Sequence, residues 1–216
     1  MNNIPRIFLV DDQPAVLKAI SRLLGLAGFK TTCFESAQDF LNSGCTTQPG
    51  CLILDLSMPE MNGIALQNEL TKFGSKLPII FLTGNGDIDT SVQAMKSGAA
   101  DFLTKPVQSA RLLTAVRDAC EKNKRIILNE IEINDIRQRL ASLTPRENDV
   151  LNLIITGKLN KQIADELSIS IQTVKIHRAR VMTKMKIKSV AGLVHLMERA
   201  SHQYIATPAD SEFSAV

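Results

Sequence analysis

The sequence has very few of the aromatic residues on which unpaired bases stack. It contains no tryptophan and only one tyrosine among its 216 residues. No apolar stretch approaches the roughly 20 residues that a membrane-spanning helix needs, and residues 1–5 lack the basic and apolar pattern of a signal peptide. We therefore expect a cytoplasmic protein with no membrane partner, and single-stranded nucleic acid is disfavoured as a ligand.

Cysteine is also scarce, and it shows none of the spacings that mark a metal site. Cys33, Cys45, Cys51 and Cys120 form no Cys-x-x-Cys pair and have no histidine nearby. Four cysteines spread in this way favour reduced, mostly buried thiols over a disulfide or a zinc site.

The charge of the chain is unevenly distributed. Residues 1–120 contain ten Lys/Arg and eleven Asp/Glu, a balance of minus one, whereas residues 121–216 contain fifteen and eleven, a balance of plus four. The sharpest concentration is at residues 175–188, with six basic residues and no acidic residue. This segment favours an anionic partner, although such a run is also typical of a solvated helix face.

The first 120 residues alternate between short apolar runs and segments with helical spacing. Five strands are predicted, at residues 6–10, 30–34, 51–55, 78–82 and 101–104, and the apolar runs are clearest at 6–10, 51–55 and 78–82. The intervening segments predict helices, at about residues 14–28, 36–42 and 64–73 and through residues 88–95. Such alternation predicts a doubly wound parallel sheet covered by helices on both faces.

The third strand ends on a lone carboxylate, Asp55, which is followed by a turn rich in Ser, Pro, Asn and Gly. Open α/β sheets keep their chemistry at the carboxyl ends of the strands. Taken alone, Asp55 could equally be a residue that ends a strand and caps a loop.

Polar residues also end three of the other predicted strands. Asp11 and Asp12 follow the first, Thr83 the fourth and Lys105 the fifth. Parallel strands end at one edge of a sheet, so we expect these side chains to converge with Asp55. Clustered carboxylates repel one another, and their oxygens suit Mg²⁺. Asp55 is then a candidate nucleophile that attacks phosphorus to give an acyl phosphate.

The pattern Asp11-Asp12, Leu-Asp55-x-x-Met-Pro-x-x-x-Gly63, Thr83-Gly84 and Lys105-Pro106 resembles the receiver domain of response regulators. The resemblance implies that Asp55 accepts phosphate from a sensor histidine kinase. It also implies Mg²⁺ as the cofactor, bound by Asp12, Asp55 and the Ser57 backbone carbonyl with the assistance of Asp11.

The same resemblance assigns a switch to the receiver. Thr83 would hydrogen-bond the phosphoryl group, Phe102 would turn inward in response, and Lys105 would neutralise charge beside a cis Lys105–Pro106 peptide. Phe102 lacks the hydroxyl that many receivers carry at this position, and it could also be a plain core aromatic.

A long helix without Gly or Pro is predicted from Ser109 to Leu140. Its second half carries an apolar seam at heptad spacing, formed by Ile126, Ile133, Ile136, Leu140 and Leu143, with Asn129 in the same seam. A seam with one Asn is what a paired parallel helix uses to fix its register. The alternative is a linker helix whose apolar stripe packs on its own domain.

Four further helices are predicted after residue 143. Thr144, Pro145 and Glu147 form a capping-box pattern that starts the first, and Asn160 and Ser170 are expected to cap the second and third. The fourth is expected over about residues 189–200. At about 100° per residue, the third helix places Val174, Val181 and Met185 on a buried face.

The opposite face of that third helix has short or polar side chains at its centre and cations at its rim. Gln172, Lys175, Ile176, Ala179 and Thr183 cluster there, flanked by Arg178, Arg180 and Lys184. This arrangement suits the DNA major groove, where rim cations meet phosphates and central side chains meet base edges.

Leu-Thr-x-Arg-Glu147, Asn160-Lys161-x-Ile-Ala164 and Thr173-Val-Lys-x-His-Arg178 resemble a LuxR-type DNA-binding domain. The resemblance places Lys175, Ile176 and Ala179 at the bases, with Thr173, Arg178 and Lys184 nearer the phosphates, and the position of Gln172 on the same helix face makes it a further candidate DNA contact. His177 either contacts the DNA backbone or packs within the fold.

The complete pattern resembles the FixJ/NarL class of regulators, the FixJ branch in particular. We expect a flavodoxin-like receiver at residues 1–121, a helical linker at 122–141, an all-α helix-turn-helix domain at 142–200 and a disordered tail at 201–216. The resemblance implies a regulator and not an enzyme, which binds double-stranded promoter DNA as a homodimer when phosphorylated and works with RNA polymerase.

Three other functions are less consistent with the sequence. An aspartate-nucleophile phosphatase would need an acid two residues after Asp55, where this chain has Ser57. A phosphate-independent regulator would have lost part of the acidic pocket, but every position is present. An RNA-binding or scaffolding role is disfavoured by the scarcity of stacking aromatics.

Overall fold

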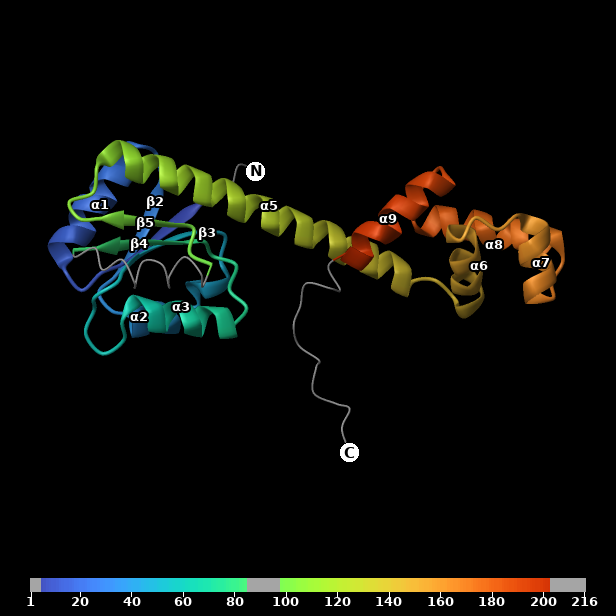
Figure 1. The fold of residues 1–216 in the computed structure, drawn as a ribbon, viewed down its shortest axis with the longest axis horizontal. Helices are drawn as coiled ribbons and strands as arrows, with labels where there is room; N and C mark the ends of the chain where they lie inside the picture. Colours follow the sequence, from blue (N-terminus) through green and yellow to red (C-terminus); the bar gives the residue numbers. More distant parts are fainter. Residues whose placement is uncertain (1–4, 85–97, 203–216) are drawn as a thin grey trace, which may run out of the picture. The chain divides into compact units, whose positions relative to one another are not determined.

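The computed structural model describes residues 5–84 and 98–202 of the chain (Figure 1). It separates into two compact units, residues 1–128 and 129–216. The helix α5, Ser109–Ala141, runs through the boundary between them.

The first unit is built on a five-stranded parallel sheet with the order β2-β1-β3-β4-β5. The strands are β1 Arg6–Val10, β2 Lys30–Phe34, β3 Gly50–Asp55, β4 Ile79–Thr83 and β5 Asp101–Thr104. All five predicted strands are confirmed. This order reverses direction between β1 and β3, which is where open α/β sheets bind ligands.

Helices cover both faces of this sheet (Figure 1). Helix α1 (Pro14–Leu26) and the first part of α5 lie on one face, while α2 (Ala37–Asn42) and α3 (Gly63–Lys72) lie on the other. A 3-10 turn, η1, occupies Cys45–Thr47. The helix expected through residues 88–95 lies outside the described residues.

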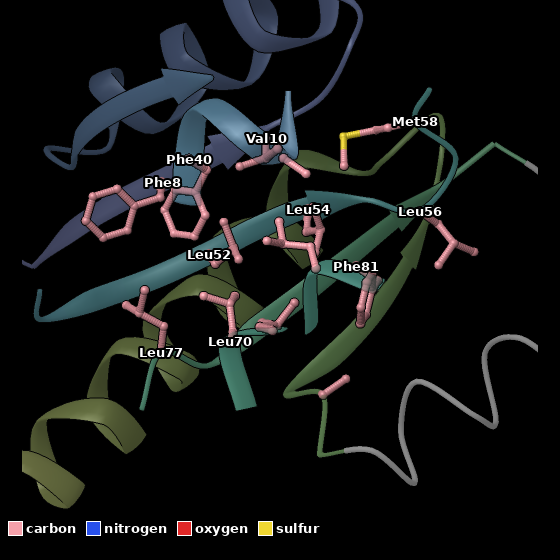
Figure 2. Packing of buried hydrophobic residues seen from close by; sticks show 14 of the residues in the cluster. Phe8, Val10, Phe40, Leu52, Leu54, Leu56, Met58, Leu70, Leu77 and Phe81 are labelled. Carbon is pink, nitrogen blue, oxygen red and sulfur yellow. The ribbon is translucent and has the colours of Figure 1, made fainter. Parts of the chain in front are cut away.

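Successive residues of the central strands supply two separate apolar cores. Phe8, Leu52 and Phe81 pack toward α2 and α3, where Figure 2 shows them with Phe40 and Leu70. The alternate residues of the same strands belong to the core under α1 and α5: Ile7, Leu9, Ile53, Ile80 and Leu82. A central strand that is buried on both faces explains why the sequence shows continuous apolar runs there.

Helix α5 is anchored to the sheet by a buried side-chain amide, Asn123, which no motif in the sequence marks. The Asn123 side chain is 3 % exposed; its Oδ1 accepts a hydrogen bond from the Gly50 N–H at 3.0 Å, and its Nδ2 donates to the Lys76 carbonyl at 2.7 Å. Gly50 fits here because a Cβ would lie 2.0 Å from the Arg6 carbonyl oxygen. The first unit therefore extends past residue 121, where we expected the receiver to end.

Asn123→Ala is expected to lower the free energy of unfolding of the first unit by about 2 to 3 kcal/mol, because it removes the side-chain hydrogen bonds to the Gly50 N–H and to the Lys76 carbonyl. The comparison is Lys124→Ala, which changes an exposed neighbour on the same helix. Urea unfolding of the full chain measures both variants. Equal losses for the two would mean that the amide does not anchor α5.

The second unit packs four helices around one apolar core. They are α6 Pro145–Ile155, α7 Asn160–Leu167, α8 Ile171–Lys184 and α9 Val190–His202. Val174, Val181 and Met185 of the α8 region are fully buried in that core, as predicted. The last helix reaches two residues into the segment that we expected to be a disordered tail, and residues 203–216 lie outside the described part.

The helix caps agree with the sequence pattern at two of three positions. Thr144 and Glu147 form the predicted capping box, and the Ser170 hydroxyl accepts from the Thr173 N–H. The prediction for Asn160 was wrong, because Asn160 is already the first helical residue and Leu159 holds the cap position. A leucine side chain cannot accept a hydrogen bond, and only the Gln162 side chain, accepting from the Leu159 N–H, completes this turn.

Most of the apolar seam of the linker helix packs against the second unit of the same chain. Ile133 and Ile136 are 3 % and 2 % exposed in the single chain, and Leu140 and Leu143 pack against the apolar core formed by α6, α7, α8 and α9. The exposed large apolar residues of this stretch are Leu128 and Ile131, which lie outside the predicted seam. The structure thus favours the second of the two interpretations, a stripe that packs on its own domain.

The cysteine thiols are mostly buried, as expected from the sequence. All four cysteines are free; Cys45, Cys51 and Cys120 are buried and Cys33 is exposed. Burial raises the pKa of the Cys120 thiol to about 11 and that of Cys51 well above its usual value, so these two thiols are unreactive. Within the described ranges, no helix is both long and apolar enough to cross a membrane.

Candidate functional site

The carboxyl ends of three strands bring two acids and one lysine into direct contact. The Lys105 Nζ lies 2.7 Å from Asp11 Oδ2 and 2.6 Å from Asp55 Oδ1. Both carboxylate side chains are 4 % exposed, whereas that of Lys105 is 19 % exposed. Residues that are 94 positions apart in the chain therefore share one polar site at the edge of the sheet, as the parallel topology predicts.

Backbone groups fix the orientation of each acid in this site. The Ser57 N–H donates to Asp55 Oδ2 at 2.9 Å, and the Gln13 N–H donates to Asp11 Oδ1 at 2.9 Å. The Lys105 N–H donates to the Thr83 carbonyl at 2.7 Å, which ties the ends of β4 and β5 together. The Lys105–Pro106 peptide bond is cis, as expected.

Gly63 allows helix α3 to begin directly against the Asp55 loop. Its N–H donates to the Leu56 carbonyl at 3.0 Å, and a Cβ at this position would lie 2.6 Å from the Asp55 carbonyl oxygen. The Asn62 side chain caps the helix by accepting from the Ala65 N–H. A larger residue at 63 would displace the backbone that holds the acid.

The electrostatic environment of the site balances burial against pairing. Burial raises the pKa of Asp55, and the hydrogen bond and charge of Lys105 only partly offset it. Burial lowers the pKa of Lys105, but its hydrogen bonds to Asp11 and Asp55 and their charges outweigh this, so the pKa lies above its usual value. Lys105 is thus firmly cationic beside a carboxylate that a further cation would help to ionise.

Asp12 is the acid of this group that is still available to a ligand. Its Oδ1 is buried and has no hydrogen-bond partner among the described residues. No three His, Cys, Asp or Glu side chains within residues 5–84 and 98–202 are arranged as a ready metal cage. Mg²⁺ commonly uses one or two carboxylates with waters and phosphate oxygens, so the donors present fit this ion.

The two predicted switch residues lie on the neighbouring strands β4 and β5. Thr83 ends β4 and is 1 % exposed. Phe102 of β5 is partly buried, and its ring lies 6.3 Å from that of Phe81, centroid to centroid. The ring thus contacts the α2–α3 core from the edge of the sheet.

Helix α8 presents the side chains that the sequence assigned to a nucleic acid. Gln172, Lys175, Ile176, Ala179, Arg180 and Thr183 are exposed, and Thr173 and Arg178 are half-buried. Ile176 is 45 % exposed, a high value for an isoleucine in a folded helix. Within this unit, α7 and α8 pack as consecutive helices separated by a short turn that contains the left-handed residue Ser168.

Lys184 differs from the other predicted DNA contacts because it has partners inside the domain. Its Nζ lies 2.6 Å from Glu147 Oε2 and donates to the Ser142 carbonyl at 2.9 Å. The Lys184 hydrogen bond, followed by that of the Thr144 N–H, lowers the pKa of Glu147 to about 2. The capping pattern identified Glu147, but nothing in the sequence links it to a lysine 37 residues later.

The lowered pKa of Glu147 predicts an acid-sensitive second unit. Because the folded-state pKa is below the usual 4.5, the pair stabilises the fold above pH 4.5 and this contribution is lost as the pH falls toward 2. Glu147→Gln, which can still serve the capping box, should therefore lose stability at neutral pH and approach the wild type near pH 2. Urea midpoints across this range, with the exposed Glu198→Gln as control, measure the effect; a constant difference at every pH would contradict it.

His177 lies on the side of α8 that is only partly exposed. Its Nδ1 is buried and has no hydrogen-bond partner within the part of the chain that the structure describes. The ring therefore belongs at least partly to the packing of the domain, the second of the two roles considered for it.

Two family models match the chain, one over each unit. The first describes the response regulator receiver domain and matches residues 7–117. The second describes bacterial regulatory proteins of the luxR family and matches residues 141–197. The first match covers the sheet and its acidic site, and the second covers the helical domain to which α8 belongs.

Proteins of known role align with nearly the whole chain. The response regulator protein TodT of Pseudomonas putida is 44 % identical, covering 89 % of this chain and 85 % of its own, and the transcriptional regulatory protein FixJ of Bradyrhizobium diazoefficiens is 40 % identical, covering 90 % and 95 %. The solved structure of the response regulator StyR has 43 % identity and a TM-score of 0.84, covering 90 % of this chain and 98 % of its own. The chain therefore belongs to the FixJ/NarL family of two-component response regulators, with a receiver domain followed by a LuxR-type DNA-binding domain.

Proposed function

We propose that Asp55 accepts a phosphoryl group from a sensor histidine kinase and that this controls binding of the second unit to promoter DNA. The observation that carries the proposal is the bridge from Lys105 Nζ to Asp11 and Asp55. A buried acid fixed by a backbone N–H and faced by a cation is suited to attack phosphorus and to bear the charge that follows.

In the proposed transfer, an Asp55 carboxylate oxygen forms a bond to phosphorus as the bond to the kinase's histidine nitrogen breaks, and the electron pair stays on the imidazole. The Ser57 N–H holds the other oxygen, Oδ2. Lys105 can exchange its contact with Asp55 Oδ1 for one with a phosphoryl oxygen while keeping Asp11. Asp12, Asp55 and the Ser57 carbonyl, with Asp11 assisting, would hold Mg²⁺, which neutralises charge on the transferring group.

Phosphorylation of Asp55 would be transmitted through Thr83 and Phe102, on the neighbouring strands β4 and β5. A phosphoryl group on Asp55 would accept a hydrogen bond from Thr83, and the Phe102 ring would move further toward the core. Such repacking changes the outer face of β5 and α5 and favours a homodimer.

The DNA contacts are proposed for the exposed face of α8. Gln172, Lys175, Ile176 and Ala179 would face base edges in the major groove, with Thr173 and Arg178 nearer phosphates. Lys184, which was expected near the phosphates, is not among the proposed DNA contacts, because its ammonium group binds Glu147 and the Ser142 carbonyl. A dimer would present two such helices to a two-fold promoter site, where RNA polymerase is the expected further partner in the cytoplasm.

Sedimentation velocity tests this proposal on the full chain. Wild type and Asp55→Asn are compared with and without Mg²⁺ and a small phosphoryl donor such as acetyl phosphate. We expect a shift from monomer to dimer only in the wild type with donor. A monomer that persists despite a verified aspartyl phosphate would refute the dimer mechanism.

A further inference from the structure

The last turns of α5 are structurally part of the DNA-binding unit. Glu132 forms a two-pronged ion pair with Arg199 of α9, with both N–O distances at 2.6 Å. Ile133 and Ile136, on the following turn, are buried. The last turns of the linker helix α5 therefore pack against the other helices of the second unit.

The recognition helix α8 is held at its carboxyl end by this same part of α5. The Arg139 Nη1 donates to the carbonyl of Met185, the C-cap residue of α8, at 3.0 Å. Its Nη2 is paired with Asp135, one turn earlier on α5. The final carbonyls of a helix lack intrahelical partners and carry partial negative charge, so a guanidinium is well suited to this position.

A second bond reinforces the same connection. Lys184, one residue before the cap, donates to the carbonyl of Ser142, which directly follows α5. The carboxyl ends of α5 and α8 are thus joined by two bonds to backbone carbonyls, so that a rotation or shift of α5 would be transmitted to α8. Lys184 is shared with Glu147, whereas the guanidinium of Arg139 binds only α5 and the α8 cap among the described residues.

We propose that Arg139 is a positioning residue for DNA recognition, fixing the orientation of α8 relative to the linker helix through the Met185 carbonyl. Arg139 itself need not touch DNA. The proposal rests on the DNA-binding function proposed above and adds a route by which α5 acts on that function. The two terminal nitrogens of a planar guanidinium group are needed, because one side chain must bind both Asp135 and the Met185 carbonyl.

The test compares Arg139→Met with Arg137→Met, an exposed arginine two residues away on α5. Fluorescence anisotropy of the full chain measures binding to a duplex selected in vitro with the wild type and to a scrambled duplex of equal length. Losing a charge-assisted hydrogen bond predicts about tenfold weaker binding of Arg139→Met to the selected duplex. Binding to the scrambled duplex should change less than about twofold, because phosphate contacts dominate it.

Two further variants separate positioning from simple loss of structure. Arg139→Lys keeps the charge without the fork and should give an intermediate loss of discrimination, and Asp135→Ala should shift binding in the same direction. Circular dichroism verifies that each variant is folded at the assay temperature. Equal binding by Arg139→Met and Arg137→Met, or an equal loss on both duplexes, would overturn the proposal. A wild type that prefers no duplex would instead overturn the DNA-binding function.

Discussion

Asp55→Asn is expected to abolish phosphorylation of the protein by acetyl phosphate in the presence of Mg²⁺. The amide removes the nucleophilic charge while it preserves the size of the side chain and an oxygen that can accept from the Ser57 N–H. Intact-mass spectrometry should show one added phosphoryl group on the wild type and none on the variant. Because the aspartate is the nucleophile in this account, no residual transfer at a lower rate is expected.

The matched control is Asp39→Asn, which removes the same charge from an exposed position of α2 in the same unit. It should become phosphorylated as the wild type does. Stoichiometric phosphate on Asp55→Asn, or loss of phosphate from both variants, would show that the acid facing Lys105 is not the acceptor.

Lys175→Ala is expected to weaken binding to a selected duplex by roughly 5- to 150-fold, the range that 1–3 kcal/mol per base contact implies. Lys175 is exposed near the start of α8, on the face that carries Gln172, Ile176 and Ala179. If Lys175 reads a base edge, discrimination against a scrambled duplex should fall in parallel. Anisotropy titrations with both duplexes at one fixed salt concentration provide the measurement.

The comparison variant is Lys188→Ala, an exposed lysine beyond the carboxyl end of α8. It should lower affinity for both duplexes slightly and equally, because only general charge is lost. If Lys188→Ala matched Lys175→Ala on the selected duplex, the exposed face of α8 would not be the reading surface.

The receiver was predictable because its signals are local and repeated. Short apolar runs mark β1, β3 and β4, and polar residues end four of the five strands. The parallel topology alone therefore implies that Asp11, Asp55 and Lys105 meet. The capping box at Thr144 and the buried face of α8 follow equally directly from residue spacing. These features depend on neighbours within one helix or on one sheet edge.

The features that escaped prediction depend on single long-range contacts. In the sequence, Asn123 looks like an ordinary polar residue of a helix. Only the fold brings the Gly50 N–H and the Lys76 carbonyl to its side-chain amide. Lys184 reads as one more cation of a basic helix, yet Glu147 lies beside it. The heptad spacing of Ile133 was compatible with packing against a second copy of the helix or against its own domain. Periodicity shows that an apolar stripe is buried, but it does not show which partner buries it.

The most direct test of the account is the DNA affinity of wild type and Asp55→Asn, each measured before and after treatment with acetyl phosphate and Mg²⁺. The duplex is one selected in vitro with phosphorylated wild type, and mass spectrometry verifies the modification in each sample. A coupling of about 1–3 kcal/mol predicts a 5- to 150-fold gain for the wild type. Asp55→Asn should show no gain. An equal gain in both proteins, or none in a fully phosphorylated wild type, would contradict the claim that Asp55 controls DNA binding.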